Sequence, residues 1–147
     1  MKIEIDQSGK IEDTNRLTVV AFANGKVKSL KISSVEKQKL VKAMRALDYP
    51  KKTFIFKIFA GLIYLLLRDE KNIDEVIIDR EYPGQEGVIK DVLSHLFRKF
   101  DRQTPLITFH RIGKKGGAHK IANDIYKGKR AANIVVTANR VFQILYN

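Results

Sequence analysis

Hydrophobic and polar residues alternate along the first third of the chain, which is the pattern of half-buried β-strands. The alternation is clear in residues 2–6 (KIEID) and again in residues 26–33 (KVKSLKIS). Between them, residues 17–23 (LTVVAFA) are rich in β-branched and aromatic side chains, and Asn24-Gly25 after them is a strong hairpin signal. The pattern therefore predicts an antiparallel meander of three strands.

Helical spacing begins after the third predicted strand. Ser33 and Glu36 form an S-x-x-E capping box, and apolar residues recur at helical spacing from there until Pro50. Residues 53–68 are almost continuously apolar, which predicts a buried helix. The remaining predicted elements are strands over residues 74–82 and 106–112, helices over residues 88–100 and 118–125, and a strand or hairpin in the tail, residues 132–147.

This order of elements predicts an α/β fold with a single domain over residues 1–147. The sheet is expected to be mixed and five-stranded, with three antiparallel strands followed by two that join in parallel through right-handed crossovers. Helices can then cover both faces of the sheet. A chain of 147 residues with 44% hydrophobic residues is large and apolar enough to bury such a core.

The composition excludes several kinds of site. The chain contains no cysteine, so disulfides, thiol nucleophiles and cysteine-ligated zinc are excluded. No secretory signal pattern opens the chain. The longest apolar run, residues 54–67, is shorter than the roughly 18 residues that a membrane span needs, and Lys57 interrupts it. We therefore expect a cytoplasmic protein without a membrane segment.

The charge of the chain favours a polyanionic partner. The formal net charge is +12, from 28 Lys and Arg residues against 16 Asp and Glu residues. A lysine-rich surface of a heat-adapted protein is the alternative explanation, but in such proteins glutamate rises together with lysine. Acidic residues do not keep pace here, so binding to nucleic acid, either RNA or DNA, is the favoured interpretation.

Four acidic residues lie where two strands and a helix could bring them together. Asp6 closes the first predicted strand. Asp79 and Glu81 share one face of the fourth, because strand side chains alternate with a period of two. Asp124 lies at the boundary of the buried face of the last predicted helix. If the first and fourth strands are neighbours, these carboxylates repel one another unless a hard divalent cation lies between them. The pattern predicts a site for Mg²⁺ or Mn²⁺, in the two-ion arrangement that supports phosphoryl transfer.

Each of these acids also has an ordinary structural explanation. Asp6 could make an Asx turn, Asp79 could form a salt bridge, and Glu81 could be solvated near its turn. Asp124 has lysines at helical spacing on both sides and could form a surface ion pair.

A glycine-rich basic segment, residues 111–120 (RIGKKGGAHK), precedes the last predicted helix. Its functional interpretation is a loop that grips phosphate beside the acids, and a solvated loop is the alternative. His119 could contact phosphate or transfer protons, or it could simply lie at the boundary of the buried face. It lies about 140° from Asp124 on the helical wheel, so the two should not bind the same ion. The candidate nucleic-acid contacts are Lys114, Lys115, His119, Lys120 and Lys127.

Three short stretches resemble the ribonuclease H-like superfamily. IDQSG at residues 5–9 is similar to the D-x-S-G first strand of many members. VIIDREY at residues 76–82 is similar to their acid-bearing fourth strand, and AHKIANDI at residues 118–125 to the last core helix, whose acid completes the site. Gln7 differs from the acid that often follows the first aspartate. The resemblance covers roughly residues 2–127.

The resemblance implies metal-dependent cleavage of phosphodiester bonds, or handling of RNA, DNA or branched DNA. It also implies that Asp6, Asp79 and Asp124 bind the ions, and we assign Glu81 an auxiliary role. We therefore predict a nuclease that uses Mg²⁺ or Mn²⁺ in a two-metal-ion mechanism. The alternatives are a non-catalytic nucleic-acid-binding domain on the same fold, and an interaction module whose charge only maintains solubility.

Overall fold

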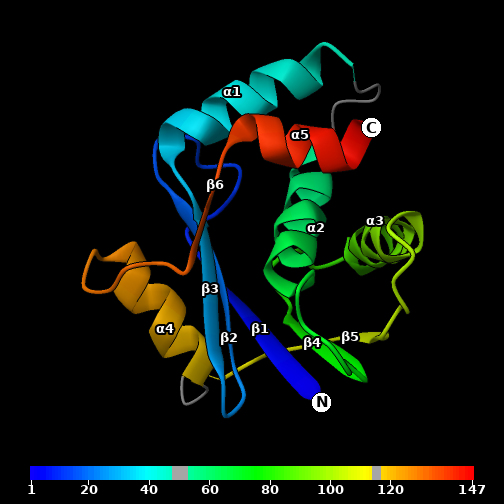
Figure 1. The fold of residues 1–147 in the computed structure, drawn as a ribbon. Helices are drawn as coiled ribbons and strands as arrows, with labels where there is room; N and C mark the ends of the chain where they lie inside the picture. The colour runs from blue at the N-terminus through cyan, green and yellow to red at the C-terminus, as the bar shows by residue number, and fades with distance from the viewer. Residues whose placement is uncertain (48–52, 114–116) are drawn as a thin grey trace.

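A computed structural model describes residues 1–47, 53–113 and 117–147 of the chain (Figure 1). The strands are β1 (Lys2–Ser8), β2 (Thr18–Ala23), β3 (Val27–Ile32), β4 (Glu75–Asp79), β5 (Leu106–His110) and β6 (Ile134–Val136). The helices are α1 (Ser34–Arg45), α2 (Phe54–Leu67), α3 (Glu86–Lys99), α4 (Gly117–Tyr126) and α5 (Ala138–Tyr146).

Within these described residues the strands form one six-stranded mixed sheet in the order β5-β4-β1-β2-β3-β6. β1, β2 and β3 pair antiparallel, as the hairpin signals predicted. β4 then joins β1 in parallel, and β5 joins β4 in parallel, which confirms the predicted arrangement of the first five strands. The predicted number of strands was wrong by one, because β6 pairs in parallel with β3 and extends the other edge.

The tail of the chain is a short strand followed by a helix, whereas the sequence had predicted a strand or hairpin. Thr137 caps α5, since its side chain accepts a hydrogen bond of 3.2 Å from the first turn. The backbone amide of Ala138 donates to Glu36 of α1 over 2.8 Å. Val141 and Ile144 are buried with Ala138 at helical spacing. Packing against α1 and α2 therefore favours a helix in a segment whose β-branched beginning had suggested continued strand.

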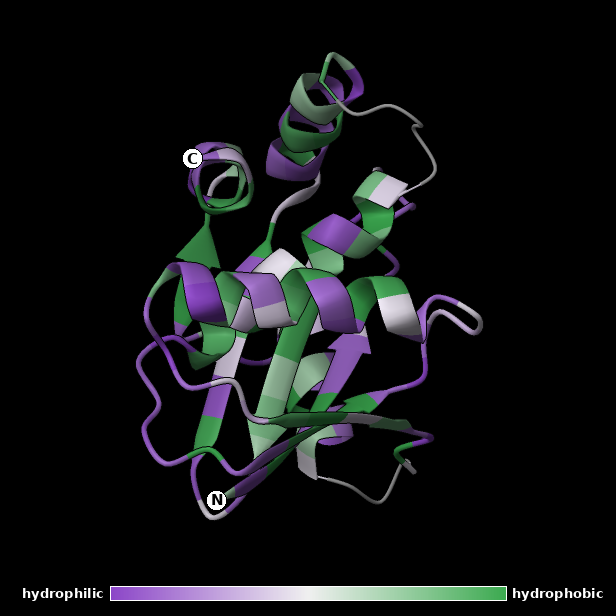
Figure 2. Ribbon diagram, turned by 90° about the vertical axis from the view of Figure 1, so that its right-hand side faces the viewer, coloured by the Kyte–Doolittle hydropathy of each residue, from purple (hydrophilic) through white to green (hydrophobic). Residues whose placement is uncertain are grey.

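Helices cover both faces of the sheet, as predicted, but unequally. α4 lies alone on one side of the sheet among the described helices, and α1, α2, α3 and α5 lie on the other (Figure 1). The alternation within β2 explains the two layers: Val20 and Phe22 point into the main core, whereas Val19 and Ala21 point toward α4. On α4 the residues that meet this second face are Ile121, Ala122 and Ile125. Hydrophilic and hydrophobic bands alternate along the helices in Figure 2, as expected when one face of each is buried.

α2 is the buried helix that the longest apolar run predicted. Every residue from Ile58 to Leu67 is buried, and the helix packs against α3, α5 and the strands β2 and β3. None of the described helices is long and apolar enough to cross a membrane.

The ends of two strands differ from the prediction in a way that shapes the acidic site. β1 continues to Ser8, so Asp6 lies inside the strand and does not close it. β4 ends at Asp79, so Glu81 lies in the connection that follows and not in the strand.

Candidate metal centre

The pairing of β1 with β4 brings two of the predicted acids next to each other. Ile5 and Ile78 are partners in this parallel pair, so the residues that follow them, Asp6 and Asp79, are neighbours across the two strands. Asp6 pairs on its other side with Ala21, whose side chain belongs to the layer under α4. The carboxylate of Asp6 is therefore on the α4 side of the sheet.

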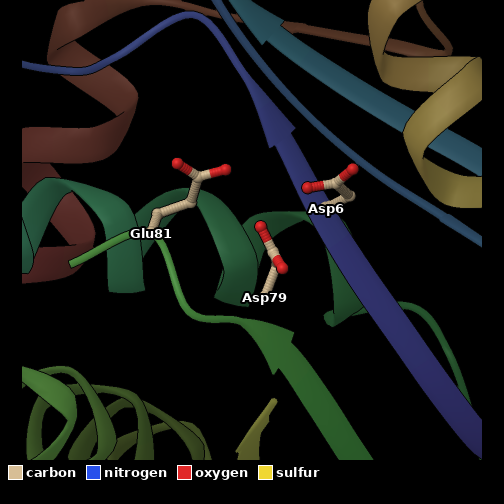
Figure 3. Close-up of side chains that lie close together, drawn as sticks. All are labelled: Asp6, Asp79 and Glu81. Carbon is tan, nitrogen blue, oxygen red and sulfur yellow. The ribbon is translucent and has the colours of Figure 1, made fainter. Parts of the chain in front are cut away.

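Asp6, Asp79 and Glu81 form a cluster that we call the acidic centre. One carboxylate oxygen from each residue lies within 4.8 Å of the other two. Among the described residues, these three form the group of acidic or histidine side chains close enough to hold one metal ion. A tight turn places the third acid, because the backbone amide of Glu81 donates to the carbonyl of Asp79 over 2.9 Å. Figure 3 shows the three side chains converging from β1, from the end of β4 and from the segment after it.

Burial and mutual repulsion raise the pKa values of Glu81 and Asp6. The pKa of Glu81 is raised to about 7, first by burial and then by its hydrogen bond with Asp79 and the charges of Asp79 and Asp6. Burial also raises the pKa of Asp6, which is 3% exposed, and the charge of Asp79 adds to this. A hydrogen bond of 2.8 Å from the amide of Gln7 opposes the shift. Negative charge is thus concentrated in a place where a bound cation or proton would relieve it.

His119 joins the acidic centre from α4. Its Nδ1 lies 2.9 Å from Oδ2 of Asp6, and its side chain is 36% exposed. The sequence had placed His119 among the nucleic-acid contacts and had not predicted this pairing with a carboxylate. A histidine held through Nδ1 presents its Nε2 in a fixed direction, which suits proton transfer or metal binding.

Asp124 is not part of the acidic centre, although it was one of the three predicted metal ligands. It lies half-buried on α4. Its backbone carbonyl accepts a hydrogen bond of 2.8 Å from the amide of Lys129. Asp124 and His119 lie on opposite sides of the apolar stripe of α4, each about 110° from its centre. The helix turns the His119 side toward β1, so His119 and not Asp124 contacts the acidic centre.

Asp79 also binds the segment that follows β5. The backbone amide of Ile112 donates to Oδ1 of Asp79 over 2.7 Å. This bond ties the start of the glycine-rich basic segment to the acidic centre. Lys114 and Lys115, two predicted nucleic-acid contacts, lie outside the described residues. Lys120 on α4 and Lys127 directly after it are exposed, as a contact with a phosphate backbone requires.

Gln7 and Tyr82 support the centre from the opposite face of β1. The Nε2 of Gln7 donates to the carbonyl of Gly9 over 2.9 Å and to the hydroxyl of Tyr82 over 3.1 Å. The amide of Ile11 donates to the same hydroxyl over 3.3 Å. Burial raises the pKa of Tyr82 to about 12. Tyr82 thereby fixes the β1–β2 connection beside Glu81, a role that no local sequence signal had indicated.

Lys10 is a second residue near the acidic centre that no local sequence signal indicates. It is exposed in the β1–β2 connection, and its charge acts to lower the pKa of Glu81. Its position follows from the folding of that connection over the end of β4, which brings together residues far apart in the sequence.

Comparison of the chain with protein-family models, with curated proteins and with solved structures finds no match.

Proposed function

We propose that this protein is a metal-dependent nuclease of ribonuclease H-like fold that hydrolyses phosphodiester bonds of RNA or DNA. The observation that carries the proposal is the acidic centre, in which three carboxylates from two strands and a turn lie within 4.8 Å of one another. The order of three antiparallel strands followed by two parallel strands supports the fold assignment.

The donor set suits Mg²⁺ or Mn²⁺. Carboxylate oxygens are the ligands that both ions prefer, and the buried charge of the centre is reduced when a cation binds. Asp6, Asp79 and Glu81 would hold the metal, which supplies Lewis-acid stabilisation of the charge that develops on the phosphate. His119 would orient Asp6 or act as a further ligand through Nε2.

The residues of the centre can also move protons. In the metal-free centre the pKa of Glu81 is raised to about 7, so this carboxyl can accept a proton at neutral pH and release it when a cation binds. His119 contacts Asp6 and is partly open to solvent, so its imidazole is accessible to a bound substrate. Exposed basic residues at Lys10, Lys120 and Lys127 would bind the nucleic-acid backbone around the acids.

A non-catalytic nucleic-acid-binding domain on the same scaffold is the alternative. The position of Asp124 outside the acidic centre favours it, because the centre then has one acid fewer than predicted. This alternative predicts salt-sensitive binding of nucleic acid without cleavage.

A cleavage assay separates the two functions. RNA/DNA hybrid, single strands and branched DNA are incubated with Mg²⁺ or Mn²⁺, and the chain is compared with Asp6→Asn and Asp79→Asn. We expect each substitution to lower the cleavage rate by about 100-fold or more, because each removes an oxygen donor from the centre. Glu4→Gln is the matched control, since Glu4 is an exposed acid on the same face of β1, and it should cleave normally. Binding with no cleavage of any substrate would establish the alternative.

A further inference from the structure

A cavity of about 450 Å³ lies among α2, α3 and α5, away from the acidic centre. Figure 1 shows these helices on the side of the sheet opposite α4, whereas the carboxylate of Asp6 is on the α4 side. The volume is in the range of small-molecule sites. The nuclease proposed above makes no use of this cavity.

The side chains around the cavity are predominantly cationic. Arg68, Arg102 and Arg140 line it, together with a single acidic side chain, Asp69. Arg68 lies 3.8 Å from Asp69, and Arg102 donates to the carbonyl of Glu70. The guanidinium of Arg140 forms no ion pair or hydrogen bond within the described residues. Guanidinium groups of this kind bind phosphate through paired N–H donors.

A buried tyrosine adds a donor that has no partner. Tyr64 is 4% exposed and lines the cavity, and its hydroxyl has no hydrogen bond within the described part of the chain. The hydroxyl is not among the fully buried atoms that lack a partner in the described part of the chain, so it faces the cavity and can donate a hydrogen bond to a ligand there. The charges of Arg102 and Arg68 act on this hydroxyl, which places the donor and the guanidinium groups at one location.

An aromatic surface completes the lining. Phe100 stacks on Tyr64 with ring centroids 5.3 Å apart and an interplanar angle of 20°. The ammonium group of Lys99 lies 5.4 Å from the centroid of the Phe100 ring, and 42% of the Phe100 side chain remains exposed. Gln143 of α5 contributes an amide that can both donate and accept hydrogen bonds.

We infer that this cavity binds a nucleotide unit, with its phosphate on Arg68, Arg140 and the Tyr64 hydroxyl and its base against the part of Phe100 that Tyr64 and Lys99 leave exposed. The cationic and aromatic parts together select a ligand that has both a phosphate and a planar ring. Gln143 can form hydrogen bonds with the edge of the base. The same chemistry is present in a free mononucleotide and in the 5′-phosphorylated end of a strand. The inference does not depend on metal binding by the acidic centre.

Calorimetric titration with adenosine monophosphate at physiological salt tests the inference. We expect Arg140→Gln to weaken binding about tenfold and Tyr64→Phe several-fold, since each removes donors to the phosphate. Tyr64→Phe retains the ring that packs on Phe97 and Phe100, so the helices should stay folded. Arg98→Gln is the matched control, because Arg98 is exposed on α3, does not line the cavity and carries the same charge; its affinity should be unchanged.

Two further ligands determine the source of the nucleotide. A 5′-phosphorylated oligonucleotide that binds tighter than the mononucleotide would assign the cavity to a strand end, and the reverse order would assign it to free nucleotides. Inorganic phosphate that binds as tightly as the mononucleotide would overturn the inference, because the base would contribute nothing. An equal loss of affinity in Arg98→Gln and Arg140→Gln would also overturn it, because attraction by overall charge would then explain the binding.

Discussion

Lys37 of α1 and the acidic centre both carry buried charge, but their surroundings differ. Lys37 is fully buried, and its ammonium group donates to the carbonyls of Lys10 and Asp13 and to the hydroxyl of Thr18 at 2.7–3.0 Å. An ammonium group has three N–H donors, so all of them are used. In the acidic centre, by contrast, carboxylates face one another within 4.8 Å.

The difference indicates which buried charge supports the fold and which can act on a ligand. A buried charge with a complete set of partners holds its neighbours in place, and burial lowers the pKa of Lys37 only to about 8, so it remains charged at neutral pH. Carboxylates with too few donors are open to a cation. The two regions meet in Lys10, whose carbonyl binds Lys37 and whose charge acts on Glu81.

The largest expected effect on stability comes from Lys37→Met, which keeps the length of the side chain but removes the ammonium group. Three buried acceptors then lose their donor, and we expect the free energy of unfolding to fall by about 3 kcal/mol. Urea denaturation measures the change.

Lys39→Met is the control for this substitution. Lys39 is in the same helix, its side chain is 65% exposed, and it pairs with Glu36 across one helical turn. We expect a loss below about 0.5 kcal/mol. Equal losses for the two lysines would show that Lys37 is not the structural anchor of the β1–β2 connection.

Addition of Mn²⁺ should have the next largest effect. At a concentration of about 100 times Kd, an ion that binds only the folded state raises the free energy of unfolding by about 2.7 kcal/mol. Asp79→Asn should abolish this increment, and Glu4→Gln should preserve it. An increment that persists in Asp79→Asn would place the ion elsewhere on the protein.

A smaller effect is expected from pH. Folding raises the pKa of Glu81 from 4.5 to about 7, so the folded state binds this proton more tightly than the unfolded chain does. The resulting stabilisation is fully present below about pH 4.5 and is lost as the pH rises through 7. After allowance for partial exposure, we expect the metal-free protein to lose about 1–2 kcal/mol relative to Glu81→Gln between pH 5 and pH 8. Urea unfolding of both proteins at the two pH values tests this, and parallel curves would contradict the raised pKa.

The smallest effect is expected for Tyr82→Phe. The ring keeps its edge-on packing against Phe56 and Phe59, but the hydroxyl that accepts from Gln7 and Ile11 is lost. We expect a loss of about 1 kcal/mol in the free energy of unfolding, measured in urea.

Tyr126→Phe provides the comparison, because the hydroxyl of Tyr126 accepts from the exposed Arg16 over 3.3 Å. Its effect should stay within about 0.5 kcal/mol. A similar loss at both positions would mean that the Tyr82 hydroxyl is no more important than a surface contact.

Local signals in the sequence predicted the elements well where one face of each is buried. The alternation in β1 and β3, the turn after β2 and the long apolar run of α2 are all borne out. The capping box was half right: Ser33 accepts from the amide of Glu36 over 3.2 Å, but the carboxylate of Glu36 binds the first amide of α5. The prediction of a strand or hairpin failed for α5, because the carboxylate of Glu36 in α1 binds the first amide of this helix. That tertiary contact is not visible in the local sequence.

The acidic centre was predicted in part. Asp6 and Asp79 could be identified because an acid buried in an otherwise apolar strand is costly unless it has a partner. Neighbouring parallel strands bring such residues together. Glu81 was identified for a different reason from the one observed, since a turn and not the strand places it. Tyr82 and Lys10 could not be identified, because their roles depend on how the β1–β2 connection folds over the end of β4.

The sequence by itself determined the order of most elements, the positive charge and the presence of acids in β1, at the end of β4 and after it, because these depend on residue type and local periodicity. Only the tertiary structure decided between His119 and Asp124. The apolar stripe of α4 fixes which face is buried, but the two residues lie at equal angles on either side of it. The packing of α4 across β1 and β2 turns one of these sides toward Asp6, and that choice depends on contacts between distant segments, such as the one between Asp6 and His119, which are 113 positions apart.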